Sequence, residues 1–256
     1  MANNYTLGRG ELHFDRFVDE ALFTSLGERY LGNTPEFSAT IESENLDHYS
    51  SDAGVKEKDA SVVLQTNRTA SFTTDNVSAE NLGLFFFGTS EAFTTAGGSV
   101  VAEPFTDVIK GLSYQLGKSI SNPSGVRNVT AVVVKKGATV LVLNTDYTVD
   151  ALLGRITLLT TGSTLITGDD LLVDHTTSSQ SRERIISGST SIAGALKYIA
   201  KNPAGKNYDW HMPYVKLSPN GDFALKGDEW QRIPFNVEIL KRFGYEAIYI
   251  DGRPAQ

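Results

Sequence analysis

Residues 35–44 read PEFSATIESE, and residues 61–73 read SVVLQTNRTASFT. In the first stretch, Phe37, Ala39 and Ile41 alternate with acidic and hydroxyl side chains, which is the period of a β-strand with one apolar and one polar face. The second stretch alternates in the same way and, fully extended, spans about 40 Å. We expect its apolar face to hold Val62, Leu64, Ala70 and Phe72. Two such strands predict a tall hairpin that reaches beyond its own domain.

The segment between the two strands, Asn45–Ala60, is polar, carries charges of both signs and has no clear period. This composition predicts a loop of about sixteen residues. Most connections in compact domains have about four to six residues, and longer ones are usually functional or disordered. We therefore treat this predicted loop as a candidate functional segment.

A short helix is predicted directly after the second strand. Ser78 is a good N-cap, Ala79, Leu82 and Phe85 recur at helical spacing, and Gly88 suits the C-terminal end. Nearer the N-terminus, Asp15–Leu26 fits a short amphipathic helix or an irregular arm.

The predicted fold is mainly β, with one helix that lays its Phe-rich face over a sheet. Short apolar runs separated by tight turns predict a small all-β module at 122–180, inserted in the main domain or part of its sheet. The main domain is then discontinuous and comprises residues 1–121 and 181–256.

The chain has 256 residues, no cysteine and a net charge of −7. It lacks a run of basic residues of the kind that binds the phosphates of nucleic acid. No catalytic or metal-binding motif is present, so we expect neither enzymatic activity nor a cofactor. Glu42 and Glu44 share one strand face and are read as solvated carboxylates instead of an acid/base pair. Trp230 is interpreted as a buried anchor, with a sugar-stacking platform as the alternative.

Three segments resemble the major tail tube protein of long-tailed bacteriophages with non-contractile tails. The first is residues 32–88, GNTPEFSATIESENLDHYSSDAGVKEKDASVVLQTNRTASFTTDNVSAENLGLFFFG. The others are residues 194–210, GALKYIAKNPAGKNYDW, and residues 217–240, LSPNGDFALKGDEWQRIPFNVEIL. The likeness extends over residues 30–90 and 185–245, whereas residues 122–180 match loosely.

The resemblance implies a β-sandwich or half-barrel with one flanking helix. It also implies a structural virion protein located in the tail and made in the host cytoplasm. Six copies form a ring, and stacked rings form the tail tube through which DNA is ejected without specific binding. The implied partners are further copies of the chain, the tape measure protein, and terminator or baseplate proteins. No membrane is implied, and the module at 122–180 is expected to decorate the exterior of the tube.

The resemblance also suggests roles for individual residues. The polar strand face is expected to line the channel, where acidic and hydroxyl groups let DNA slide. The residues assigned to this lumen face are Glu36, Ser38, Thr40, Glu42 and Glu44. Charges in the predicted loop suit ion pairs with a neighbouring subunit. The residues assigned to this inter-subunit loop are Asp47, His48, Asp52, Lys56, Glu57, Lys58 and Asp59.

Two alternative functions remain open at this stage. The chain fits another ring-forming tail component, such as a terminator or baseplate ring, because related folds occur there. It also fits a carbohydrate-binding β-sandwich module, which predicts a concave cluster of aromatic or carboxylate side chains.

Overall fold

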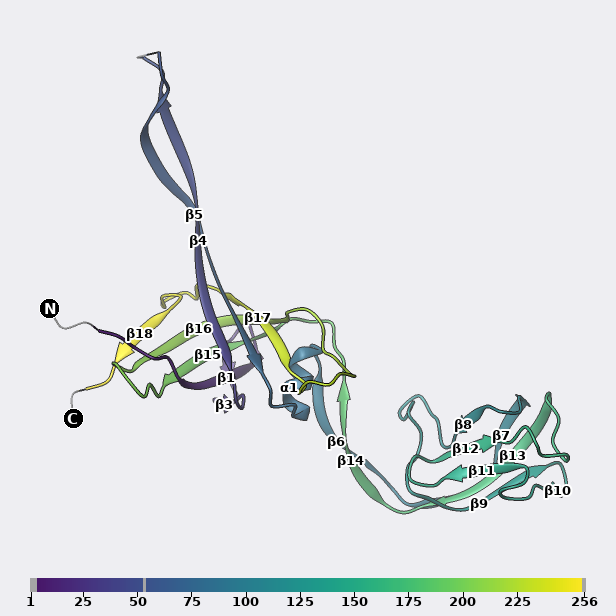
Figure 1. Ribbon diagram of the computed structural model, residues 1–256. Coiled ribbons are helices and arrows are strands. Elements are labelled where there is room, and N and C mark those ends of the chain that lie inside the picture. The colour runs from purple at the N-terminus through teal and green to yellow at the C-terminus, as the bar shows by residue number, and fades with distance from the viewer. Residues whose placement is uncertain (1–3, 53, 255–256) are drawn as a thin grey trace. The chain divides into compact units, whose positions relative to one another are not determined.

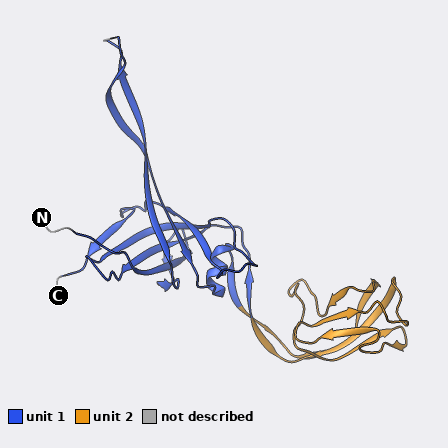
Figure 2. Cartoon of the chain, in the orientation of Figure 1, with its two compact units in different colours: residues 1–91, 183–256 blue, residues 92–182 orange. Residues whose placement is uncertain are grey.

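The computed structural model describes residues 4–52 and 54–254. The chain divides into two compact units, which Figure 2 colours separately: unit 1 comprises residues 1–91 and 183–256, and unit 2 comprises residues 92–182. Unit 2 therefore begins well before the expected start at residue 122. The expected start was wrong because β7 (Gly98–Val108) pairs along its length with β13 (Asp169–Thr177), and local sequence texture does not reveal so distant a pairing.

Unit 1 is built on one antiparallel sheet in the strand order β2-β1-β15-β16-β17-β5-β4, with β3 paired to β1 and β18 paired to β16 (Figure 1). Its strands are β1 (Gly10–Asp19), β2 (Thr24–Ser25), β3 (Arg29–Tyr30), β4 (Glu36–Ser50), β5 (Glu57–Thr74), β15 (Ile192–Ala200), β16 (Tyr208–Pro219), β17 (Ile233–Ile239) and β18 (Tyr249–Gly252). Asp15–Leu26, expected as a helix or an arm, is the end of β1 and its turn into β2.

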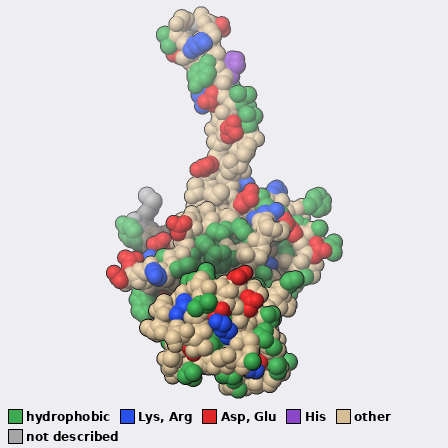
Figure 3. Space-filling view, turned by 90° about the vertical axis from the view of Figure 1, so that its right-hand side faces the viewer, with side chains coloured by type: hydrophobic (Ala, Val, Ile, Leu, Met, Phe, Trp, Pro, Cys, Tyr) green, Lys and Arg blue, Asp and Glu red, His purple; other side chains and the backbone are tan. Residues whose placement is uncertain are grey.

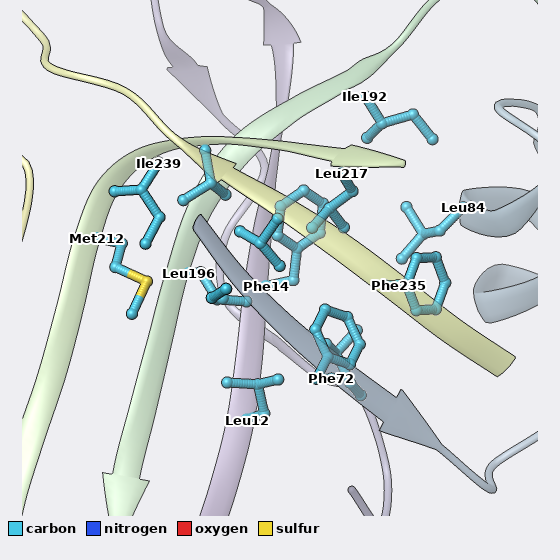
Figure 4. Close-up of a cluster of buried hydrophobic side chains, with 14 of the residues drawn as sticks. Leu12, Phe14, Phe72, Leu84, Ile192, Leu196, Met212, Leu217, Phe235 and Ile239 are labelled. Atoms are coloured by element: carbon cyan, nitrogen blue, oxygen red, sulfur yellow. The ribbon is translucent and has the colours of Figure 1, made fainter. Parts of the chain in front are cut away.

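Period-two alternation places the core of unit 1 on one face of this sheet. In β17, Ile233, Phe235, Val237 and Ile239 are buried, whereas the residues between them are more exposed. The Phe235 ring stacks on Phe72 with a centroid distance of 4.8 Å. Figure 4 shows these rings among the aliphatic side chains of the neighbouring strands and of the helix. Burial of such side chains is the main stabilising term of the unit.

The predicted helix is confirmed as α1 (Ala79–Phe85), the one helix in the part of the chain that the structure describes. The Ser78 side chain caps it by accepting a hydrogen bond from the Asn81 backbone N–H, at 3.2 Å. Leu84 and Phe85 are buried against the sheet. Among the described residues, no helix has the length and hydrophobicity needed to cross a bilayer.

Unit 2 is all-β with its own core, centred on Val134, Ile156, Leu158 and Val173. A four-stranded sheet has the order β10-β9-β13-β7, and a three-stranded sheet has the order β11-β12-β8. The strands not yet given are β8 (Ser113–Gln115), β9 (Val129–Lys136), β10 (Thr139–Val140), β11 (Tyr147–Asp150) and β12 (Arg155–Leu158). The expectation of a mainly β, sandwich-like fold is confirmed.

The chain passes between the units through two strands that pair with each other, β6 (Thr89–Thr95) and β14 (Gln180–Ile186). On the unit 1 part of this ladder, Arg184 Nε and Nη2 both donate to Glu91 Oε1, at 3.0 and 2.6 Å. Of the two arrangements left open for the module, the structure has an inserted unit with its own core.

Candidate functional site: the hairpin of β4 and β5

β4 and β5 form a hairpin whose strands are longer than the other strands of the sheet. β4 pairs with β5 from Glu36 opposite Thr73 to Ser50 opposite Glu57. β17 covers the other edge of β5 only from Thr69 to Thr74. We call residues 36–40 and 69–74 the hairpin base, and residues 41–50 and 57–68 the distal hairpin. The ten β4 residues of the distal hairpin extend about 33 Å.

The expected sixteen-residue loop is therefore wrong, because both strands continue into it. Asp47 and His48 belong to β4, whereas Glu57, Lys58 and Asp59 belong to β5. Only Asp52 and Lys56 of the assigned loop residues lie in the connecting turn. Residues of low strand propensity adopt strand here because the partner strand supplies the hydrogen bonds, so tertiary pairing overrides local preference.

Two ion pairs join charged side chains of the distal hairpin. Lys58 Nζ lies 2.7 Å from Asp47 Oδ1, and Ser61 Oγ donates to the same oxygen at 2.7 Å. The hydrogen bond from Lys58 lowers the pKa of Asp47 below its ordinary value. His48 Nδ1 lies 2.5 Å from Asp59 Oδ1. These five side chains therefore have their polar partners within the hairpin.

The five predicted lumen residues share one face of β4 and are exposed. Cross-strand partners on β5 extend this face with hydroxyl and amide groups, and Ser38 Oγ lies 3.0 Å from Ser71 Oγ. The partner pairs are Glu36–Thr73, Ser38–Ser71, Thr40–Thr69, Glu42–Asn67 and Glu44–Gln65. In the described chain no cation forms an ion pair with any of the three glutamates.

The polar face continues across β17 and β16. Their residues were not among the lumen residues predicted from the sequence. One row consists of Ser38, Ser71, Asn236 and Ser218, and the next consists of Thr40, Thr69, Glu238 and Lys216. The cation in the second row, Lys216, pairs with Glu20 at 2.8 Å. The period-two alternation of residues 233–239, IPFNVEI, is the sequence signal that points to Asn236 and Glu238 on this face.

A β-bulge interrupts the hairpin at Leu64. Glu44 lies opposite Gln65 and Asn45 opposite Val63, so Leu64 has no partner on β4. Beyond this bulge Val62 lies opposite Leu46, which shares its face with Glu44. The expectation that Val62 shares a face with Ala70 and Phe72 is therefore wrong, because one extra residue inverts the alternation.

Large apolar side chains cover much of the distal hairpin without contacting the core. Leu46 and Val62 form a cross-strand pair and are 62% and 61% exposed. The further exposed apolar residues of this region are Ile41, Tyr49, Val63 and Leu64, and the connecting turn adds Val55. Figure 3 shows hydrophobic side chains interspersed with charged ones along this arm. Several large, exposed apolar side chains on one element make it a candidate interaction site.

The outer edge of β4 is also free. β4 is the last strand of the sheet order, and no described strand pairs with its second edge. Unpaired N–H and C=O groups along an edge strand are a template for pairing with another chain. The hairpin thus offers both an apolar surface and a hydrogen-bonding edge.

Two hollows lie near the hairpin base. The first has a volume of about 560 Å³ and is lined by Phe37, Tyr198 and Trp210, with the Phe37 and Tyr198 rings 5.6 Å apart. The second, of about 680 Å³, is lined by Glu36 and by Trp230. Trp230 is 92% exposed, so the expectation of a buried anchor is wrong. Among the described residues, no group of His, Asp and Glu side chains has the proximity that a metal ion requires.

A search of curated proteins finds no match to the chain. A family model matches residues 5–243, which include the hairpin, unit 2 and most of the remaining sheet of unit 1. The chain therefore belongs to the family described as protein of unknown function UCP028589.

Proposed function

We propose that this protein is a non-enzymatic structural subunit that assembles into stacked hexameric rings. These rings form the tail tube of a long-tailed bacteriophage and conduct DNA during ejection. The observation that carries the proposal is the distal hairpin, which pairs only with itself and exposes large apolar side chains.

The exposed surface supports assembly with copies of the same chain. Leu46 and Val62 are exposed and so contribute little to the stability of the folded chain. Burying them against a neighbouring copy would stabilise the contact by about 25 cal/mol per Å² of apolar area removed from water. The free edge of β4 supplies backbone groups that a neighbouring strand can pair. Repetition of one such head-to-tail contact generates a closed ring when the rotation closes.

The polar face supports the role of a DNA channel. The three glutamates that β4 contributes to it form no ion pair in the described chain, and hydroxyl and amide groups lie opposite them on β5. Carboxylates repel phosphate and hydroxyls leave it hydrated, so DNA moves along such a surface without adhering. Unit 2 contains equal numbers of acidic and basic residues, so the whole net charge of −7 resides in unit 1.

The reach of the hairpin favours stacked rings over a single terminator or baseplate ring. Its distal part extends about 33 Å past the last strand that supports it. A single ring needs contacts between lateral neighbours only, whereas stacking needs an element that reaches the next ring. We therefore assign the distal hairpin to contacts with neighbouring copies.

A carbohydrate-binding module is the second candidate, favoured by the exposed Trp230 at the edge of its hollow. Under that candidate, Trp230→Ala abolishes glycan binding and leaves the oligomeric state unchanged. Under the proposed function, the purified chain binds no glycan through Trp230 and forms tubes.

Negative-stain electron microscopy of the purified chain at increasing concentration tests the proposal. We expect tubes or stacked rings with sixfold symmetry. A variant in which residues 44–65 are replaced by Asn-Gly is expected to stay folded by circular dichroism and to remain monomeric, because Ser43 and Thr66 are already paired.

The control variant changes the Gly137-Ala138 turn of unit 2 to Asn-Gly, which leaves the hairpin intact, and it is expected to form normal tubes. A wild-type chain that stays monomeric at high concentration would contradict the proposal. Normal tubes from the shortened hairpin would contradict it equally.

A further inference from the structure

The basic side chains of unit 2 fall into two groups. Some are already engaged: Lys135 and Lys136 pair with aspartates, Lys110 donates to a backbone carbonyl, and Arg182 donates to Asn122 Oδ1 at 2.8 Å. The remaining three have no carboxylate partner in the described chain. These are Lys118, Arg127 and Arg155.

All three of these cations line one hollow of about 390 Å³. Polar side chains of Ser113, Gln115 and Ser124 complete the lining together with Leu153. No carboxylate lines the hollow. A concave surface that presents several cations and hydroxyl donors is complementary to an anion.

Three lining residues, Ser113, Gln115 and Arg155, come from β8 and β12 of the sheet β11-β12-β8, whose strands Figure 1 shows. Arg155 lies directly opposite Gln115 in the register, so both side chains are on the same face. The next pair in the register, Ile156 and Tyr114, points to the other face, where Ile156 is fully buried. The core below the sheet therefore holds the strand that carries Arg155.

Loops beside the sheet fix Arg127. Its Nη1 donates to the backbone carbonyls of Ser124 at 2.8 Å and Leu153 at 3.0 Å. Nε and Nη2 of Arg127 have no hydrogen-bond partner within the described chain. One guanidinium nitrogen thus anchors the group and the other two remain available to a ligand.

Glycines make this arrangement rigid. Gly154 has φ +66°, and a Cβ there would lie 2.2 Å from the Val126 carbonyl oxygen. Gly125 has φ +69°, and a Cβ there would lie 2.3 Å from the Leu116 carbonyl oxygen. Only glycine fits both positions, and the close approach of the loops builds the hollow before any ligand arrives.

We propose that this hollow binds a phosphate group. Guanidinium groups donate two parallel hydrogen bonds to tetrahedral oxyanions, and Lys118 adds a further charge. Free inorganic phosphate and a phosphate of a phosphodiester-linked polymer present the same chemistry. The inference rests on unit 2 alone and does not depend on the proposed tube.

One carboxylate moderates the affinity of the hollow without lining it. Asp150 lies opposite Arg155 in the β11–β12 register, and its Oδ1 accepts a hydrogen bond from the Leu153 N–H at 2.9 Å. Its negative charge opposes binding of an anion to Arg155. Asp150→Asn is therefore expected to tighten phosphate binding.

Isothermal titration calorimetry of the full chain with inorganic phosphate at low ionic strength tests the proposal. The informative variant is Lys118→Gln with Arg155→Gln, because neither side chain makes a hydrogen bond in the described chain and folding is expected to be retained. We expect at least about tenfold weaker binding, since two charge-assisted contacts are lost. The control is Lys206→Gln with Lys226→Gln, two exposed lysines of unit 1, which is expected to bind phosphate like the wild type.

A second titration with a glycerol phosphodiester oligomer distinguishes the two sources. Tighter binding per phosphate group assigns the hollow to a polymer, whereas weaker binding assigns it to the free ion. Absence of phosphate binding by the wild type overturns the proposal. An unchanged affinity in the Lys118/Arg155 variant, or an equal loss in the control, overturns it as well.

Discussion

β5 runs through two environments within a single strand. At the hairpin base, Ala70 and Phe72 are 6% and 2% exposed and pack in the core of unit 1. In the distal hairpin, Val62 and Leu64 are 61% and 60% exposed. Both regions use apolar residues at strand spacing, yet only the base has a layer of protein to cover them. The base therefore stabilises the folded chain, whereas the distal residues contribute little until another molecule covers them.

The largest effect is expected at the base, from Phe72→Ala. Phe72 stacks on Phe235, and its removal leaves a cavity that the surrounding strands fill only in part. We expect the free energy of unfolding to fall by about 3–5 kcal/mol in urea denaturation followed by circular dichroism. A loss below about 1 kcal/mol would erase the distinction between the base and the distal hairpin.

A smaller loss is expected from Asn81→Ala beneath the base. The buried Asn81 amide donates to the Leu31 and Asn76 carbonyls at 2.9 and 2.8 Å, and its oxygen accepts from Arg29 at 2.8 Å. Removing it leaves buried polar groups without partners and is expected to lower the free energy of unfolding by about 1–3 kcal/mol. Asp59→Asn, at the exposed distal pair with His48, serves as the comparison and is expected to cost about 0–1 kcal/mol in the same assay.

The distal apolar pair is expected to matter for assembly and scarcely for folding. Leu46→Thr with Val62→Thr keeps strand propensity and changes the free energy of unfolding by less than about 0.5 kcal/mol. We expect this variant to form no tubes in electron micrographs. Val101→Thr, a similarly exposed position on β7 of unit 2, is the matched control and is expected to assemble normally. Tubes from the double variant would show that the distal apolar surface is not an interface.

The smallest effect concerns the titration of the distal hairpin. The hydrogen bond from Lys58 lowers the pKa of Asp47 in the folded chain. A carboxyl with a lowered pKa stabilises the hairpin above its unfolded pKa of about 3.9, and this contribution is lost as the pH falls through the folded value. In Lys58→Met, NMR titration is expected to show the pKa of Asp47 returning toward its ordinary value. Lys56→Met removes the same charge from the turn, and Asp47 is expected to titrate there as in the wild type.

Local patterns in the sequence predict the parts of the fold that depend on local chemistry. Alternation around Phe37 and Phe72 predicts the two strands, and Ser78 predicts the start of α1. The helix ends at Phe85, before the predicted stop at Gly88, and the left-handed residue that follows it is Phe87. The shared face of the five polar β4 residues also follows from alternation alone. Features that depend on distant pairing were not predictable: strand continuation through Asp47 and Lys58, and the start of unit 2 at Ala92.

The bulge and the exposure of Trp230 illustrate the same limit for the candidate site. An unpaired Leu64 leaves no mark in a one-strand pattern, because the extra residue is defined only against β4. Trp230 is apolar enough for a core, and only the surrounding fold decides that no described element covers it.

The junction at β6 and β14 is suited to replacement of unit 2 by another domain. Gly88 approaches so closely that a Cβ would lie 1.8 Å from the Ile186 carbonyl oxygen, and the Gly188 N–H donates to the Phe86 carbonyl at 3.0 Å. The chain thus leaves and re-enters unit 1 about one strand spacing apart, about 4.8 Å. A cassette with adjacent termini can replace unit 2 there without breaking the host sheet, as domain insertion requires. The junction is therefore a suitable attachment point for an inserted domain.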